Sequence, residues 1–203
     1  MSDSDILYRP WGAVTSEFWV RPELAQQAVP AARAQEPDSS SRLGSATAAD
    51  GSAAEMPAAY REGILLVTSA FASKDAQVLQ AAVIEAERLD QTMTSEYGEQ
   101  DLRTISVREM RGWLAHLTGQ HEMATRWYLH TVGLLSSLVG TPDDRTRASA
   151  KRAVATWMAI ADEAAAQGLA PTVLTMAEAA EGKESASAKA IQRRVSGWTS
   201  ARA

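Results

Sequence analysis

The stretch from Ser106 to Leu135, SVREMRGWLAHLTGQHEMATRWYLHTVGLL, decides the fold. Apolar residues recur in it at intervals of three to four, which is the spacing of one face of an α-helix. The pattern is interrupted once, at Thr118 and Gly119, and then resumes. Two helix-sized patterns joined by so short a turn predict an antiparallel pair of helices.

The sequence after Pro57 extends this pattern into a series of helices separated by glycine or proline. We expect the folded body to begin at Pro57, since proline is favoured at the first position of a helix. No stretch shows sustained β alternation, so the predicted fold class is all-α, with about six to seven helices. The expected helices are 57–72, 75–96, 104–118, 120–138, 143–167, 171–181 and 184–198.

The ends of these helices carry recognisable turn signals. Asp75 is expected to cap the second helix, and Thr141 or Asp143 the fifth, because short polar side chains accept hydrogen bonds from free backbone amides. Gly98, Gly140 and Gly182 are expected to follow helix ends, where glycine is common. Gly168 is expected to end the fifth helix and Pro171 to open the sixth.

The residues before the helical body differ in composition. Residues 1–22 contain Tyr8, Trp11, Phe18 and Trp19, and we expect these rings to dock on the chain's own helices or on a partner. Residues 23–56 have no aromatic residue and are rich in Ala, Ser, Gln, Pro and Gly. Such a stretch buries too little apolar area to offset the entropy of ordering it, which predicts a disordered linker. The expected organisation is an aromatic interaction segment (1–22), a linker (23–56) and a helical domain (57–203).

Composition excludes several classes of function. The chain has 203 residues and a formal net charge of −5, whereas general nucleic-acid binding rests on basic surface. It has no cysteine, which excludes thiol catalysis, disulfides and cysteine metal sites. The first residues lack the pattern of a signal peptide, and no apolar run is long enough to span a bilayer. We therefore expect a cytoplasmic protein with no membrane partner, and the alanine- and arginine-rich composition suggests a bacterium such as an actinomycete.

Part of the deciding stretch resembles the second half of a tetratricopeptide repeat. In that pattern a turn glycine is followed five residues later by a small residue and four residues after that by an aromatic, here Gly119, Ala124 and Tyr128. The alanine that normally follows three residues later is Thr131, a departure. Helix 104–118 fits if its turn carries one extra residue, which puts Arg111 at the pattern's glycine. The large apolar positions are then Val107, Met110 and Leu114, and Leu79, Val83 and Ala86 take the second-helix positions of an earlier repeat.

The resemblance implies stacked antiparallel helix hairpins that bind a protein partner. In such proteins the first helix of each repeat lines a concave groove, where basic residues hold acidic or carboxylate-ended peptides. By this resemblance Arg108 and Arg111, which are expected to lie off the apolar face of their helix, are candidate partner-binding residues. The alternative for both is a solvated face paired with neighbouring acids.

Residues that often carry catalysis do not form a recognisable motif. His116, His121 and His130 lack the HExxH spacing, and with a turn between them we do not expect them to meet. The carboxylates Glu85, Glu87 and Asp90 are expected on a solvated helix face. The chain has no phosphate-binding glycine loop and no nucleophile elbow. We therefore expect no catalytic, cofactor-binding or metal-binding residues.

Two features of the body have alternative interpretations. Trp113 and Trp127 lie in facing halves of the helix pair, and core packing is favoured over contact with a ligand. The C-terminal run KESASAKAIQRRVSGWTSARA, residues 183–203, carries an apolar stripe beside basic residues. It is interpreted as a helix that covers the end of the stack, with partner binding or nucleic-acid contact as alternatives.

The favoured function is a non-enzymatic protein–protein interaction adaptor. The helical domain would bind through its groove, and the tethered aromatic segment would engage a second surface. The alternative is a structural or regulatory subunit of a larger bacterial assembly, and a more remote one is a helical-bundle enzyme. Nucleic acid and small-molecule substrates are not expected.

Overall fold

The computed structural model describes residues 56–200, and these contain seven α-helices and no strand. The expectations for residues 1–22, for almost all of the linker 23–56 and for residues 201–203 lie outside this part of the chain. Two 3-10 segments, η2 (Ala58–Tyr60) and η3 (Ala70–Ala72), flank the first α-helix. The α-helices are α3 (Arg61–Ser69), α4 (Ala76–Tyr97), α5 (Leu102–Leu117), α6 (His121–Leu138), α7 (Asp144–Met158), α8 (Glu163–Glu181) and α9 (Ala186–Ser200).

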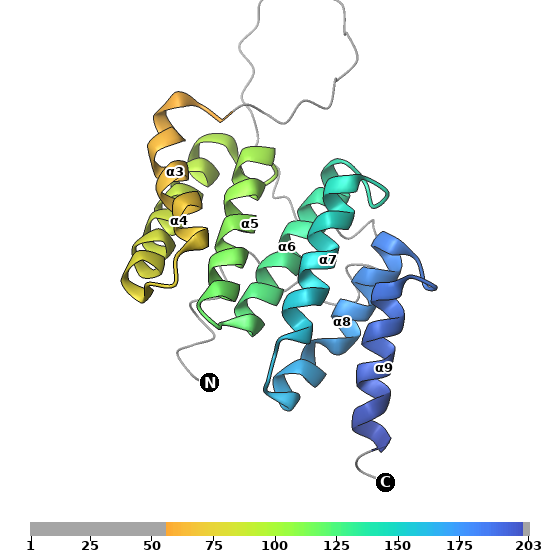
Figure 1. Cartoon of the computed structure of the whole chain (residues 1–203). Coiled ribbons are helices and arrows are strands. Elements are labelled where there is room, and N and C mark those ends of the chain that lie inside the picture. The colour runs from red at the N-terminus through yellow and green to blue at the C-terminus, as the bar shows by residue number, and fades with distance from the viewer. Residues whose placement is uncertain (1–55, 201–203) are drawn as a thin grey trace, which may run out of the picture.

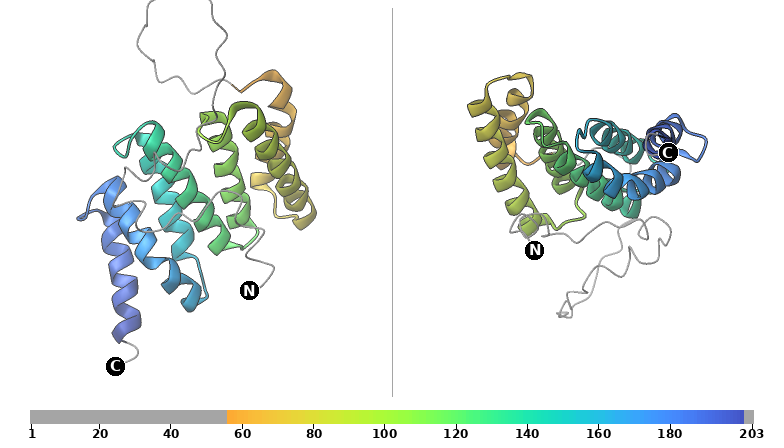
Figure 2. Two further views of the ribbon diagram at one scale, coloured as in Figure 1. Left: turned by 180° about the vertical axis from the view of Figure 1, so that it is seen from behind. Right: turned by 90° about the horizontal axis from the view of Figure 1, so that it is seen from below.

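The helices follow one another across the molecule in chain order. Each α-helix packs against the next, and α6 also contacts α8 as α7 contacts α9. Figure 1 shows this progression from α3 (orange) at one end to α9 (blue) at the other, and Figure 2 shows it from two further sides. None of the helices in residues 56–200 is both long and apolar enough to cross a membrane.

The turn signals of the sequence act locally, as expected. The side chains of Asp75 and Asp143 accept hydrogen bonds from the backbone amides of Gln77 and Arg145, the second residues of α4 and α7, each at 2.8 Å. Gly98 and Gly182 follow α4 and α8 with φ of 86° and 94°, in the left-handed region that suits glycine. Gly140 has a φ of 92° in the connection after α6. These predicted boundaries are confirmed.

The boundary predicted at Gly168 and Pro171 is wrong. Helix α7 ends at Met158, and α8 begins at Glu163 and continues through both residues to Glu181. The new helix begins where Asp162 accepts hydrogen bonds from the amides of Ala164 (2.9 Å) and Ala165 (3.4 Å). Gly168 and Pro171 are exposed, so neither interrupts the buried face of α8. The apolar face of α8 therefore outweighs two residues with poor helix propensity.

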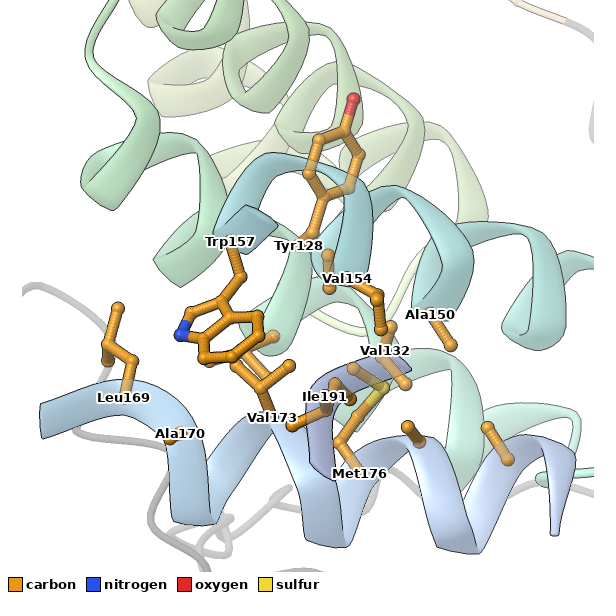
Figure 3. Packing of buried hydrophobic residues seen from close by; sticks show 14 of the residues in the cluster. Tyr128, Val132, Ala150, Val154, Trp157, Leu169, Ala170, Val173, Met176 and Ile191 are labelled. Atoms are coloured by element: carbon orange, nitrogen blue, oxygen red, sulfur yellow. The ribbon is translucent and has the colours of Figure 1, made fainter. Parts of the chain in front are cut away.

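The interior consists of two apolar clusters that meet around α5 and α6. The first lies among η2, α3, η3, α4 and α5, with Val67, Leu89 and Met93 fully buried. The second lies among α6, α7, α8 and α9, around the fully buried Trp157. Figure 3 shows Trp157 among neighbours from α8 and α9, including Val173. The Trp157 Nε1–H donates to the carbonyl of Ala166 at 2.8 Å, so its polar atom is satisfied.

Helix α9 covers the end of this second cluster. Ile191 is fully buried, and Val195 and Trp198 pack against the cluster. Arg194 donates hydrogen bonds to the carbonyls of Trp157 and Ile160, both at 2.6 Å, at the C-terminal end of α7. A cation is favourable there because the last carbonyls of a helix have no partner within it. This packing agrees with the interpretation of the C-terminal run as a covering helix.

Candidate functional site

A buried group of charged side chains joins α4, α5 and α6. Asp90 on α4 is fully buried, and the Nε atom of Arg108 on α5 donates to its Oδ1 at 2.9 Å. Arg111 donates from Nη1 to the other carboxylate oxygen at 2.6 Å. Thr94 accepts from Arg108 at 3.0 Å and lies 3.2 Å from Asp90 Oδ1. We call Asp90, Thr94, Arg108, Arg111 and His130 the buried charged cluster.

Two expectations from the sequence fail at this cluster. Asp90 was assigned to a solvated face, and Arg108 to a position off the apolar face, but neither side chain has any exposed area. The sequence signal was misleading because helical spacing reports which residues share a face, not what packs against them. An ion pair between residues on two different helices lets both charges be buried. Arg108 is therefore placed to hold α4 and α5 together, and we do not propose it as a partner contact.

Arg111 lies at the edge of the cluster. Its side chain is 20% exposed and also approaches Glu87, with 4.0 Å between Nη2 and Oε1. Its guanidinium carbon lies 4.3 Å from the centre of the Trp127 ring on α6, a cation–π arrangement. Arg111 is thus held by an acid on α4 and an aromatic ring on α6. Most of its surface is therefore engaged within the chain.

His130 closes the cluster from α6. Its Nε2 lies 3.1 Å from Nη1 of Arg108, and because a guanidinium only donates, the imidazole nitrogen accepts. Burial and then the neighbouring Arg108 lower the pKa of His130 to about 4, although the charge of Asp90 acts in the opposite direction. The imidazole is therefore neutral at neutral pH. A neutral acceptor facing the paired guanidinium of Arg108 contributes to the association of α5 with α6.

The helix pair of the deciding stretch is held by a close approach at Gly112. A Cβ atom built on Gly112 would lie 3.2 Å from two ring atoms of Tyr128 and 3.3 Å from Cβ of Trp127. Ala124 and Tyr128 are buried on the facing side of α6, as the sequence predicts for a small residue and a space-filling ring. The role of Gly112 was missed because the sequence interpretation assumed an extra turn residue. The signal in the sequence was that Gly112 directly follows Arg111, the residue placed at the glycine position of the repeat pattern.

A partly exposed surface runs along the other side of α5. Glu109, Trp113 and His116 lie at intervals of four and three residues, so they share one face of the helix. Trp113 is 36% exposed, which corrects the expectation of core packing. Arg152 of α7 joins this face through Glu109, with 3.1 Å between Nη1 and Oε1. We call Glu109, Trp113, His116, His121 and Arg152 the Trp113 face.

Two histidines meet on this face, contrary to the expectation that the turn keeps them apart. The Nδ1 atoms of His116 and His121 are 3.2 Å from each other, and the His116 ring is stacked on the Trp113 indole with 5.1 Å between ring centres. The turn is what joins them: Gly119 has a φ of 77°, and it brings the last turn of α5 against the first residue of α6. Spacing in the sequence does not report such a reversal of chain direction.

The third histidine, His130, belongs to the buried charged cluster, where it contacts Arg108, whereas His116 and His121 contact each other. Within residues 56–200, no group of three or more His, Asp or Glu side chains is arranged to hold a metal ion. Tyr8, Trp11, Phe18 and Trp19, the expected aromatic contacts, lie outside the described residues.

The Trp113 face combines an exposed indole, two imidazoles that meet at the α5–α6 turn, and one ion pair between α5 and α7. Tryptophan is enriched among the residues that carry most of the energy of protein interfaces. Of the two sites, this face is the more exposed, because Asp90 and Arg108 of the buried charged cluster have no exposed side-chain area. Comparison of the chain with protein-family models, with curated proteins and with solved structures finds no match.

Proposed function

We propose that the chain is a non-enzymatic adaptor that binds a protein partner on the Trp113 face and carries a second, tethered contact in residues 1–22. The observation that carries the proposal is Trp113 itself, a tryptophan 36% exposed among side chains from three helices. An indole held at the surface by a stacked imidazole offers a large apolar contact with little loss of entropy on binding.

A tetratricopeptide-like arrangement of the helices is part of this proposal. With no extra turn residue, the glycine position of that pattern falls on Gly112, where α5 approaches α6 most closely. Gly112, Ala124 and Tyr128 then occupy the small, small and aromatic positions of one repeat. The contacts between neighbouring helices, and between alternate ones such as α6 and α8, agree with a stack of hairpins.

The same register accounts for the departures in α5. The pattern places a tryptophan four residues and a leucine one residue before its glycine, which are Arg108 and Arg111 here. Both arginines point toward Asp90 of the preceding helix, at 2.9 and 2.6 Å. We interpret the buried charged cluster as an ionic replacement for the apolar contact between successive hairpins. This explains why the family signature is weak around α5.

The partner is proposed to contact α5 from the side that α7 also reaches. In a stack of hairpins the first helices of successive repeats line the groove, and α5 and α7 would be such helices. The ion pair between Glu109 and Arg152 agrees with this, because it joins these two alternate helices. We propose that a partner's apolar side chain packs on the Trp113 indole. Arg152, which is 51% exposed, is available to an acidic group beside it.

The test is affinity capture with mass spectrometry, using the full chain and variants as baits. Trp113→Ala is expected to lose the partner, and the matched control Leu138→Ala replaces a large exposed residue away from this face and is expected to keep it. A third bait replaces Tyr8, Trp11, Phe18 and Trp19 by serine. If that bait alone loses capture, the arm rather than the Trp113 face binds the partner.

Two outcomes would contradict the proposal. Equal recovery of the same partner by the Trp113→Ala bait and the wild-type bait would exclude the Trp113 face. Stoichiometric recovery of a multisubunit complex, with release requiring denaturation, would favour a structural subunit over an adaptor. Circular dichroism of each bait establishes that the substitutions leave the helices folded.

A further inference from the structure

The distance between the Nδ1 atoms of His116 and His121 suits two ligands of one metal ion. Imidazole nitrogens bind late first-row transition metals at about 2.0–2.1 Å, so two such nitrogens on one ion are separated by roughly 2.9–3.4 Å, from square-planar to tetrahedral coordination. The separation of the two Nδ1 atoms is 3.2 Å, within this interval. We infer that His116 and His121 form a two-imidazole site for a divalent ion such as Ni²⁺, Cu²⁺ or Zn²⁺.

At least one imidazole of the pair offers a lone pair to an ion. Two Nδ1 atoms at 3.2 Å cannot both carry a hydrogen, so at least one lone pair is directed into the space between them. An imidazole that carries its hydrogen on Nδ1 presents the other lone pair after changing to the Nε2–H tautomer, with no net loss of a proton. Burial, and then the neighbouring His121, lower the pKa of His116. Neutral imidazole is the form that binds metal.

The backbone holds both ligands in place before any ion arrives. The α5–α6 connection is closed by hydrogen bonds from the Gly119 amide to the His116 carbonyl (3.0 Å) and from the Gln120 amide to the Ala115 carbonyl (2.8 Å). The Trp113 ring stacks on His116 and limits the rotation of that side chain. Ligands on rigid helix ends lose little entropy on binding.

The site has open coordination positions. No third His, Asp or Glu completes a ligand group there among residues 56–200, so water fills the remaining positions. Two protein ligands make an exchangeable site rather than a closed structural one. The inference does not rest on the proposed function, because metal binding requires the two imidazoles and no partner.

The test is isothermal titration of the untagged full chain with Ni²⁺ and with Zn²⁺. The wild-type chain is expected to bind one ion per molecule. His116→Asn and His121→Asn are each expected to weaken binding roughly tenfold or more, because a metal ligand is lost and even residues that only support ligands cost about 10–100-fold. The matched control is His130→Asn, which removes the third histidine and is expected to leave the affinity unchanged.

A spectroscopic readout identifies the bound atoms. Long-range ¹H–¹⁵N spectra of the imidazoles, recorded during a Zn²⁺ titration, are expected to shift the Nδ1 resonances of His116 and His121 and not those of His130. Shifts of His130 alone, no saturable binding by the wild-type chain, or unchanged affinity in either single variant would overturn the inference. These readings concern metal only. Partner capture is read on Trp113→Ala, which keeps both imidazoles, so failure of the proposed function and failure of this inference are distinguishable.

Discussion

At the scale of single residues, the buried charged cluster shows how a charge is kept inside a small helical protein. Asp90 receives donors from Arg108 and Arg111, and both its oxygens are engaged. The charges of Asp90 and Arg108 have been removed from water, which is costly, and each is compensated by the other at hydrogen-bond distance. The cluster therefore contributes to stability only as a complete set.

Asp90→Ala is expected to lower the free energy of unfolding by about 3–5 kcal/mol, because it leaves Arg108 buried without its carboxylate. The matched control is Glu122→Ala, which breaks an exposed pair with Arg126 and is expected to cost at most about 1 kcal/mol. Urea denaturation of the three proteins measures both values. Equal urea midpoints for the two variants would show that the buried ion pair contributes no more to stability than the exposed one.

His130 makes stability depend on pH. Its pKa is lowered to about 4 in the folded chain, below the ordinary value of 6.5, so the unfolded chain binds more protons between these values. The contribution of neutral His130 is complete above pH 6.5 and is lost as the pH falls toward 4. Urea midpoints at pH 7, 5.5 and 4.5 are expected to converge for His130→Gln and the wild-type chain as the pH falls. A constant difference between the two would contradict this assignment.

At the scale of helices, α8 shows that single residues with poor helix propensity do not always end a helix. Gly168 and Pro171 are both poor in helix interiors, yet α8 runs through them because its buried face is continuous from Ala166 to Ala180. Pro171 has no amide hydrogen to donate to the preceding turn and lies on the exposed side. The helix begins where Asp162 accepts a hydrogen bond from the Ala164 amide, and not at Pro171 as the sequence predicted.

Gly168→Ala is expected to stabilise the chain by about 0.5–1 kcal/mol, since alanine is the better helix former and no atom lies within 4 Å of its added Cβ. The matched control is Gly119→Ala, which also has no atom near its Cβ but has a φ of 77°. That variant is expected to be destabilised by roughly 1 kcal/mol. Thermal denaturation measures whether each variant is more or less stable than the wild-type chain. A loss of stability in Gly168→Ala would contradict a continuous α8 and favour the helix end predicted at Gly168.

At the scale of the whole molecule, the order of the helices in space repeats their order in the chain. Contacts join neighbours and next neighbours, so the ends of the molecule have fewer supporting elements than its middle. Arg194 of α9 donates to carbonyls at the C-terminal end of α7. Helix α3, in contrast, packs mainly on α4 and has Leu65 and Leu66 exposed. The two ends are therefore supported differently.

Amide hydrogen exchange is expected to follow this difference. The amides of α3 should exchange fastest among the helices, those of α9 more slowly, and those of α6 and α7 at rates close to global unfolding. Mass spectrometry of peptides from the full chain measures the order. Protection of α3 equal to that of α6 would show that another part of the chain covers it.

Most of the secondary structure was predictable, because it depends on local signals. Helical spacing of apolar residues, caps such as Asp75 and Asp143, and glycines such as Gly98 each act within a few residues of their own position. Most of the candidate site was not predictable. Asp90 meets Arg108 across two helices, and whether Trp113 is covered depends on how the neighbouring helices are arranged.

The sequence by itself determined an all-α chain, where most of its helices begin and end, and which faces are apolar. The tertiary structure alone decided which charges are buried, that Gly112 approaches Tyr128, and that His116 and His121 meet at a turn. The physical reason is the range of the interactions. Backbone hydrogen bonds and caps are satisfied within one helix, whereas burial, ion pairing and exposure are properties of how separate helices pack.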